Sequence, residues 1–249
     1  MGRWAVRNIW IIAKREFKAY FATPVALVFI VIFLALTGAF AFYVGNFFDR
    51  GVADLGAFFT YHPWLFLLLV PAIGMRLWAE ERKSGTMELL MTLPVSTIDA
   101  VLGKFLAAWA FCGVALALTF PMWITVNVLG EPDNGVVLTG YIGSFVMAGS
   151  YLAISACISA LTRNQVIAFI IAATVCFLFT MSGAQLVLNF FQGWAPEFLV
   201  EALRSMSFLT HFQAVTRGVI DAKDVIFFGS LIALWLFFNV IAVELNKGR

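Results

Sequence analysis

Few side chains in this sequence have the chemistry that catalysis or metal binding requires. The two histidines, His62 and His211, stand far apart, and two isolated imidazoles supply too few ligands for a zinc or haem site. Cys112, Cys157 and Cys176 fall inside apolar runs without C-x-x-C spacing, which favours buried thiols over a disulfide framework. We therefore expect no metal and no cofactor in this chain, and a hydrogen-bonding or gating role for the histidines.

A phosphate-binding loop is also missing from the sequence. The motif G-x-x-x-x-G-K-[ST] does not occur, because the Gly103-Lys104 pair is followed by Phe105. The chain is therefore predicted not to be an enzyme and not to hydrolyse ATP by the usual apparatus.

The most informative segment runs from Trp78 to Ser96 with the sequence WAEERKSGTMELLMTLPVS, and charged residues crowd its start. Gly85 allows a turn after the charges, and Thr86 can cap a short helix. Glu88 falls in the first turn of that helix, where the helix dipole favours a carboxylate. Pro94 then ends the helix.

The short helix in this segment is amphipathic. Met87, Leu90 and Met91 recur at i, i+3 and i+4 and form an apolar face. Such a helix is suited to dock into a groove on a soluble partner. The same pattern also fits an ordinary structured loop, and the residues alone leave both interpretations open.

The composition places the surrounding elements in a membrane. Of 249 residues, 62% are apolar and 12% are charged, against roughly 25% charged residues in a soluble domain. Six charge-free stretches approach or exceed the length of about 20 residues that a spanning helix needs. Since only a helix satisfies its backbone hydrogen bonds within one lipid-embedded segment, we predict an all-α polytopic membrane protein with six transmembrane helices.

The whole chain, 1–249, is predicted to form a single membrane domain. Its N-terminal part is amphipathic, with basic residues beside an apolar sector, and such a helix lies in the headgroup plane until Pro24 breaks it. The apolar sector consists of Val6, Ile9, Trp10, Ala13, Phe17, Tyr20 and Phe21. The predicted segments are an interfacial helix at 1–22, spans at 24–46, 58–80, 100–128, 138–162, 164–186 and 224–245, a cytoplasmic segment at 81–96, and an external segment at 187–222. A tight hairpin is expected near Arg163, between the fourth and fifth spans.

The distribution of Lys and Arg orients the spans. Twelve of the 16 basic residues fall on the side of the termini, which predicts that both termini lie in the cytoplasm. The membrane itself is expected to be a bacterial inner membrane. A net charge of only +2 gives no broad basic field for nucleic acid.

Two stretches resemble a known family. The run E-E-R-K-S-G-T-M-E-L-L-M-T-L-P-V-S resembles the signature of ABC-2 type transporter permeases, at their coupling element after the second span. The stretch from Ser207 to Asp221, followed by Asp224-Val225, is similar to a narrower branch. That branch contains gliding-motility permeases and the permeases of nitrous-oxide-reductase maturation.

The resemblance implies an exporter in which two permease subunits, identical or paralogous, each meet one cytoplasmic ATP-binding subunit. ATP and Mg²⁺ would then sit on the ATP-binding partner. The resemblance carries the ATPase-coupling role to Glu80, Glu81, Arg82, Gly85, Thr86, Met87, Glu88, Leu89, Leu90 and Met91. An accessory membrane or periplasmic subunit is a further expected partner. Simple charge anchoring at the membrane surface stays the alternative for Glu80 and Glu81.

The resemblance also implies short re-entrant helices between the fifth and sixth spans, which form an outer gate. The residues expected at this gate are Phe190, Phe191, Trp194, His211 and Phe212.

Two other functions compete with ATP-driven export. The chain could serve as a non-transporting membrane scaffold for an ATPase complex, which only a functional assay separates from a permease. An ATP-independent channel or carrier is the second alternative, but carriers often place charged residues at the membrane midplane, and the predicted spans contain none there. The sequence does not reveal the transported substrate.

Overall fold

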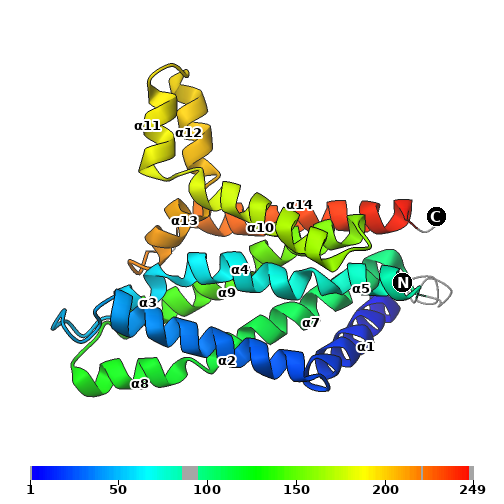
Figure 1. Ribbon diagram of the computed structural model, residues 1–249, viewed down its shortest axis with the longest axis horizontal. Coiled ribbons are helices and arrows are strands. Elements are labelled where there is room, and N and C mark those ends of the chain that lie inside the picture. The colour runs from blue at the N-terminus through cyan, green and yellow to red at the C-terminus, as the bar shows by residue number, and fades with distance from the viewer. Residues whose placement is uncertain (1, 86–94, 220, 247–249) are drawn as a thin grey trace.

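The computed structural model describes residues 2–85, 95–219 and 221–246, and the regular structure within these ranges is helical. In Figure 1 most helices run side by side as one bundle, and both termini lie at the same end of it. The helices are α1 (Gly2–Phe21), α2 (Pro24–Ala39) continued by the π-helical turn η1 (Phe40–Val44), α3 (Gly56–Thr60), α4 (His62–Gly74), α5 (Arg76–Ser84), α7 (Thr97–Ala117), α8 (Phe120–Leu129), α9 (Asn134–Leu161), α10 (Gln165–Met181), α11 (Gln185–Gln192), α12 (Glu197–Ser205), α13 (Phe208–Val215) and α14 (Ala222–Leu245).

Five helical stretches in the described residues are long and apolar enough to cross a bilayer. They are Ala26–Val44, His62–Ser84, Thr97–Leu129, Asn134–Leu161 and Ala222–Leu245. A sixth is reached only if α10 and α11, which meet at a bend of 70°, count as one broken span. The expected fifth span, 164–186, is therefore a 17-residue helix followed by a sharp turn out of the bundle.

The helix boundaries follow from local chemistry. Pro24 opens α2 at its first helical position, where its missing N–H costs nothing, so α1 and α2 separate at the predicted place. The hairpin expected near Arg163 is confirmed: α9 ends at Leu161, and the Asn164 side chain caps α10 by accepting from two backbone amides.

Helix α9 forms the centre of the bundle. Of its most apolar 18-residue window 83% is buried, against 22% for the corresponding windows of α2 and α14. Serine hydroxyls of α9 donate hydrogen bonds within the helix or to a neighbouring helix. Ser155 donates to the Tyr151 carbonyl oxygen, and Ser159 donates to the Met75 carbonyl oxygen. Small, satisfied polar residues of this kind let helices pack closely in lipid.

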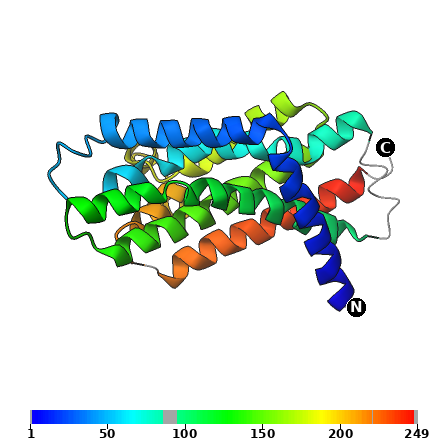
Figure 2. The same cartoon turned by 90° about the horizontal axis from the view of Figure 1, so that it is seen from below.

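Helix α1 crosses one end of the bundle obliquely and packs along α7 (Figure 2). Ile12 and Ala13 are buried there, whereas Val6 and Trp10 are 67% and 68% exposed. The predicted apolar sector is therefore divided, because part of it faces protein and part faces outward. The outward part keeps the character of a membrane-surface helix.

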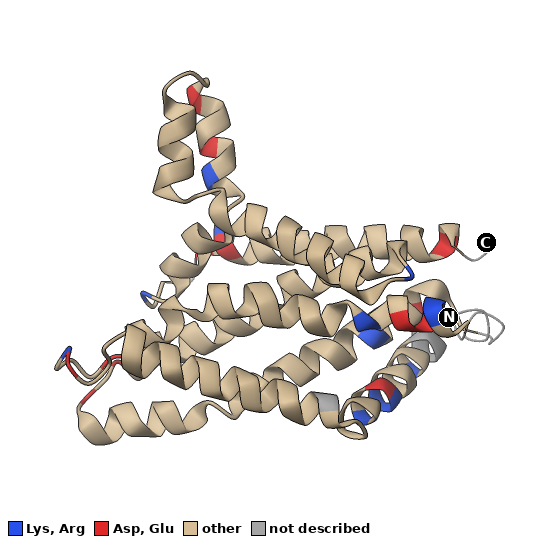
Figure 3. Cartoon of the chain, viewed as in Figure 1, with Lys and Arg blue, Asp and Glu red and all other residues tan. Residues whose placement is uncertain are grey.

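Charges gather at the two ends of the bundle and along the α11–α12 hairpin, and the helical middles are nearly free of them (Figure 3). The hairpin of α11 and α12 projects away from the bundle (Figure 1). Ionisable side chains therefore meet helix ends at the end of the bundle that holds the termini and at the base of the hairpin, and the candidate functional residues lie at these two places.

Candidate functional site

The densest charged cluster lies where α1, α5 and α7 meet. Lys104 of α7 is 2% exposed, and its Nζ lies 2.6 Å from Glu81 Oε1 of α5 and 3.3 Å from Glu16 Oε2 of α1. One buried ammonium thus joins three helices. Two carboxylates around it supply the pairing that a buried cation requires.

Close helix packing brings Lys104 into this position. A Cβ on the preceding Gly103 would lie 2.7 Å from Ile12 Cγ2, so only glycine lets α1 approach α7 this closely. The ammonium also stands 5.4 Å from the centroid of the Trp78 ring, within cation–π range. Burial raises the pKa of Glu16, but Lys104 and Arg15 outweigh this effect and hold that pKa below its usual value.

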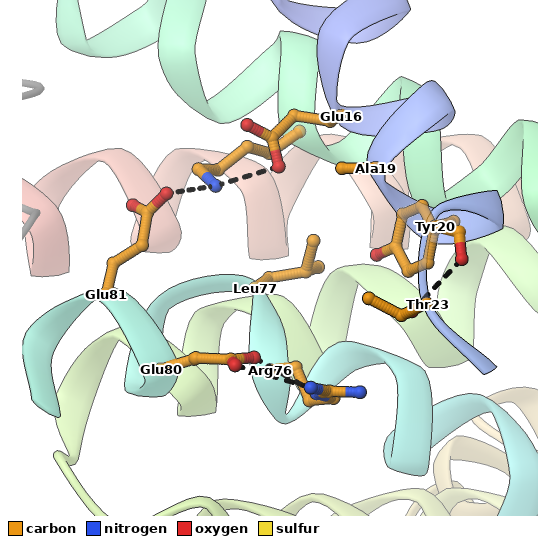
Figure 4. Close-up of a pocket in the computed structure, with 9 residues that line it drawn as sticks. Glu16, Ala19, Tyr20, Thr23, Arg76, Leu77, Glu80 and Glu81 are labelled. Atoms are coloured by element: carbon orange, nitrogen blue, oxygen red, sulfur yellow. Dashed lines mark hydrogen bonds and ion pairs between the residues drawn. The ribbon is translucent and has the colours of Figure 1, made fainter. Parts of the chain in front are cut away.

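A cavity of about 260 Å³ opens beside this cluster. Figure 4 shows Glu81 and Glu16 on one side of it, Glu80 with Arg76 on the other, and Leu77 and Tyr20 between them. The Arg76–Glu80 pair, at 3.0 Å, lies within α5 and is 31% and 50% exposed. Exposed pairs of this kind contribute little to stability. The side of the cavity formed by the buried Lys104 cluster is therefore held more strongly than the side formed by Arg76 and Glu80.

Arg82, also in α5, binds a different pair of helices, α9 and α14. It donates to the Ala160 carbonyl oxygen at 2.8 Å and to Asn246 Oδ1 at 2.9 Å. Asn246 in turn donates to the carbonyl oxygens of Ala160 and Ala242. The last turn of α5 is thereby fixed to the C-terminal ends of α9 and α14, whose final carbonyls need such donors.

Four of the ten predicted coupling residues fall on this part of α5. Glu81 and Arg82 make the interhelical contacts, Glu80 stays paired within its own helix, and Gly85 ends α5 at φ +74°, a left-handed turn that favours glycine. The other six, from Thr86 to Met91, lie outside the described residues, so their helix remains a prediction.

The sequence analysis missed Lys104 and Glu16. The sequence predicts no role for Lys104 beyond excluding a phosphate loop at the Gly103-Lys104 pair, and none for Glu16. A signal did exist, because Lys104 is a lone charge with Gly103 before it in a run that is otherwise apolar from Ala100 to Gly130. Such a lysine needs a buried carboxylate partner, but the pattern does not say which of the 14 acidic residues supplies it.

The five residues expected at an outer gate form two separate groups within one chain. Phe190, Phe191 and Trp194 contact one another on the projecting hairpin, and Phe190 and Trp194 are 68% and 67% exposed. His211 and Phe212 are buried in the bundle. The gate itself stays a prediction, and a single chain does not close it.

The remaining candidates for chemistry are buried individually. His62 donates or accepts through Nδ1 with the Ser144 hydroxyl at 2.7 Å and is packed among phenylalanine rings. The three cysteines are buried and free. Across the described ranges 2–85, 95–219 and 221–246, no three His, Cys, Asp or Glu residues come together in a geometry that could hold a metal ion.

Long apolar helices around a buried small-residue centre, with charges kept to the ends, define a multi-pass membrane protein. The model of the ABC-2 family transporter proteins matches residues 10–245, and the chain belongs to that family. It is thus a transmembrane permease of the ABC transporter class. The family implies an ATP-binding ABC partner subunit, and permeases of this family are membrane subunits that are not themselves catalytic. None of the curated proteins compared with the chain matches it.

Proposed function

We propose that this chain is the membrane-spanning subunit of an ATP-driven exporter, and that the end of α5 and the segment after it receive the motion of the ATP-binding subunit. The observation that carries the proposal is the double attachment of α5. Glu81 and Lys104 join it to α7 and α1, and Arg82 joins it to α9 and α14.

This attachment makes the end of α5 a mechanical junction. A force on the chain beyond Gly85 acts on a helix whose last turn is held by buried or half-buried polar contacts to four other helices. Buried charge pairs resist separation because each partner would be left uncompensated. The helices therefore move with α5 rather than slide past it, which coupling to a soluble motor requires.

The assembly proposed for this junction contains two permease copies, identical or paralogous, and two ATP-binding subunits that hold ATP and Mg²⁺. Both termini lie in the cytoplasm of a cell with a bacterial inner membrane, as the Lys and Arg distribution favours. The proposed contacts of the permease with the ATPase are made by Thr86, Met87, Glu88, Leu89, Leu90 and Met91, which lie outside the described residues. An accessory membrane or periplasmic subunit completes the proposed complex. Within the family, the proposed branch is that of the gliding-motility and nitrous-oxide-reductase-maturation permeases.

The outer side of the proposed exporter is the α11–α12 hairpin with α13. Phe190, Phe191 and Trp194 on the hairpin, with His211 and Phe212 beneath it, form the outer gate once two copies face each other. The exposure of Phe190 and Trp194, 68% and 67% in the single chain, supports this proposal, because a second copy could cover them.

Reconstitution of the permease with its ATP-binding subunit in proteoliposomes tests the coupling. Changing Glu80, Glu81 and Glu88 together to alanine should still allow insertion and should abolish ATP-dependent transport per assembled complex. The amount of assembled complex is measured separately, because loss of the Glu81 carboxylate also removes a partner of buried Lys104. Lys223→Gln, which removes an exposed charge at the far end of the bundle, is the matched control and should transport normally. Full ATP-dependent transport by the triple variant would refute the assignment.

A non-transporting scaffold for an ATPase complex is the second candidate, because the same junction would also hold a motor in place. The two functions differ in their response to cargo. Stimulation of ATP hydrolysis by a transported substrate supports the exporter, and hydrolysis that ignores every candidate cargo supports the scaffold.

A further inference from the structure

His211 joins three helices at the base of the projecting hairpin. Its Nδ1 lies 2.5 Å from Asp224 Oδ1 in the first turn of α14, and its Nε2 lies 2.9 Å from the carbonyl oxygen of Ser205, the last residue of α12. The side chain of His211 is 10% exposed and that of Asp224 is 2% exposed. The imidazole also stacks on Phe227, with the ring centroids 4.1 Å apart.

These two contacts fix the number of protons on the pair. A carbonyl oxygen only accepts hydrogen bonds, so Nε2 must carry a hydrogen. The short contact between Nδ1 and the carboxylate oxygen needs a second hydrogen, which sits either on Nδ1 or on Asp224. In both arrangements the pair holds two protons and has no net charge, which suits a site with so little water.

Loss of one proton breaks this arrangement. The pair would then carry a net negative charge, and only one ring nitrogen would keep a hydrogen. Because the buried Asp224 carboxylate needs its donor most, the remaining hydrogen stays on Nδ1. The lone pair of Nε2 then faces the lone pairs of the Ser205 carbonyl, and that contact is lost.

We propose that His211 and Asp224 form a proton-binding site that holds the α11–α12 hairpin in place. With the proton bound, the C-terminal carbonyl of α12 is anchored through His211 to α14. Without it, α12 loses this anchor and the hairpin reorients about Met206, between α12 and α13. The proposal stands on the described contacts alone and does not depend on what the protein transports.

The surrounding charges do not substitute for the proton. Lys223 and Asp221, at the start of α14, pair with each other at 2.9 Å with the lysine 69% exposed, and Lys223 acts on Asp224 only through space. Glu201 and Arg204 of α12 are exposed, and in the described part of the chain no ion pair connects them to the His211 pair. Helices α9, α10, α11 and α13 contain no other charged residue.

The proton can be observed directly, because the chain contains only two histidines. Full-length protein labelled with ¹⁵N-histidine, purified without a polyhistidine tag into lipid nanodiscs, would be titrated from about pH 5 to about pH 9, the range in which histidine normally changes charge. A His211→Gln variant assigns the signals. We expect Nε2 of His211 to lose its hydrogen during this titration, and we expect no such step in Asp224→Asn, whose amide can donate to a neutral ring. A wild-type His211 signal that never changes overturns the proposal.

The response of the hairpin is measured with two spin labels on the same protein. Leu186→Cys on α11 and Val128→Cys on α8 are 83% and 79% exposed positions, and the native cysteines are buried. The distance distribution between the labels should shift over the pH interval in which His211 loses its proton, and it should stay constant in Asp224→Asn. Lys223→Gln, which disrupts only the exposed pair, should shift as wild type does. A constant distance in the wild type while His211 titrates also overturns the proposal.

Discussion

Replacing Glu81 by glutamine should cost more stability than replacing its partner Lys104 by methionine, although both changes break the same ion pair. The reason is unequal burial. The Lys104 side chain is 3% exposed, whereas those of Glu81 and Glu16 are 20% and 19% exposed. Removing the carboxylate leaves a cation that is almost fully buried, whereas removing the cation leaves two carboxylates whose side chains are about one-fifth exposed.

The expected magnitudes follow from this difference. Removing one partner of a buried pair costs about 3–5 kcal/mol. Glu81→Gln should fall near the lower end, about 3 kcal/mol, because Lys104 keeps Glu16 at 3.3 Å. Lys104→Met should cost less, about 1 kcal/mol, since methionine fills the space beside Trp78 and the Glu81 and Glu16 side chains are 20% and 19% exposed.

Equilibrium unfolding of the full-length protein in mixed micelles, driven by an increasing fraction of sodium dodecyl sulfate and followed by tryptophan fluorescence, measures both costs. Glu80→Gln is the control, because it breaks the exposed pair with Arg76 and should cost less than about 1 kcal/mol. If Lys104→Met destabilised the protein as much as Glu81→Gln, the argument from unequal burial would be wrong.

Three further outcomes are expected. Gly103→Leu should destabilise the packing of α1 on α7 by about 1–3 kcal/mol, measured in the same unfolding assay. Gly229→Ala is its control and should be neutral or slightly stabilising, because a Cβ at that position meets nothing within 4 Å. The pKa of Glu16 is lowered in the folded protein, so its contribution is fully present above its unfolded pKa and is lost as pH falls through its folded pKa. The protection of α1 amides from hydrogen exchange, expressed relative to the intrinsic exchange rate at each pH, should therefore fall in acid, and Glu16→Gln should remove that dependence. Arg82→Gln, which cannot reach both acceptors, should reduce ATP-dependent transport more than it reduces assembly, and Asn246→Ala should reproduce part of that loss.

The broad architecture could be predicted because lipid imposes simple rules. Long charge-free runs must be helical, Pro24 must interrupt a helix, and a stretch on both sides of Arg163 is too long for one span. The structure follows these rules at each of those places. The family also followed from one run of residues and the order of the spans, and the match to residues 10–245 confirms it.

The interhelical contacts could not be predicted in the same way. Glu16 and Lys104 are 88 residues apart in sequence, and Arg82 and Asn246 are 164 apart, so only the packing of whole helices brings them together. The fifth span shows a second limit. The sequence predicts that this span ends at 186, close to the break between α10 and α11, but it does not predict the 70° bend. A Cβ on Gly183 would lie 2.5 Å from Ser207 Cβ, and a packing contact of this kind cannot be predicted from the apolar run.

The central position of α9 has a consequence for how the protein is made. It packs against α4 and α7, which precede it in the chain, and against α10 and α14, which follow it. A nascent chain that has inserted α9 therefore leaves the side of this small-residue helix that α14 covers exposed to lipid until α14 is synthesised. Termination before Ala222 would leave that side permanently uncovered, and we expect such a product to be degraded by membrane quality control rather than to accumulate as a smaller transporter.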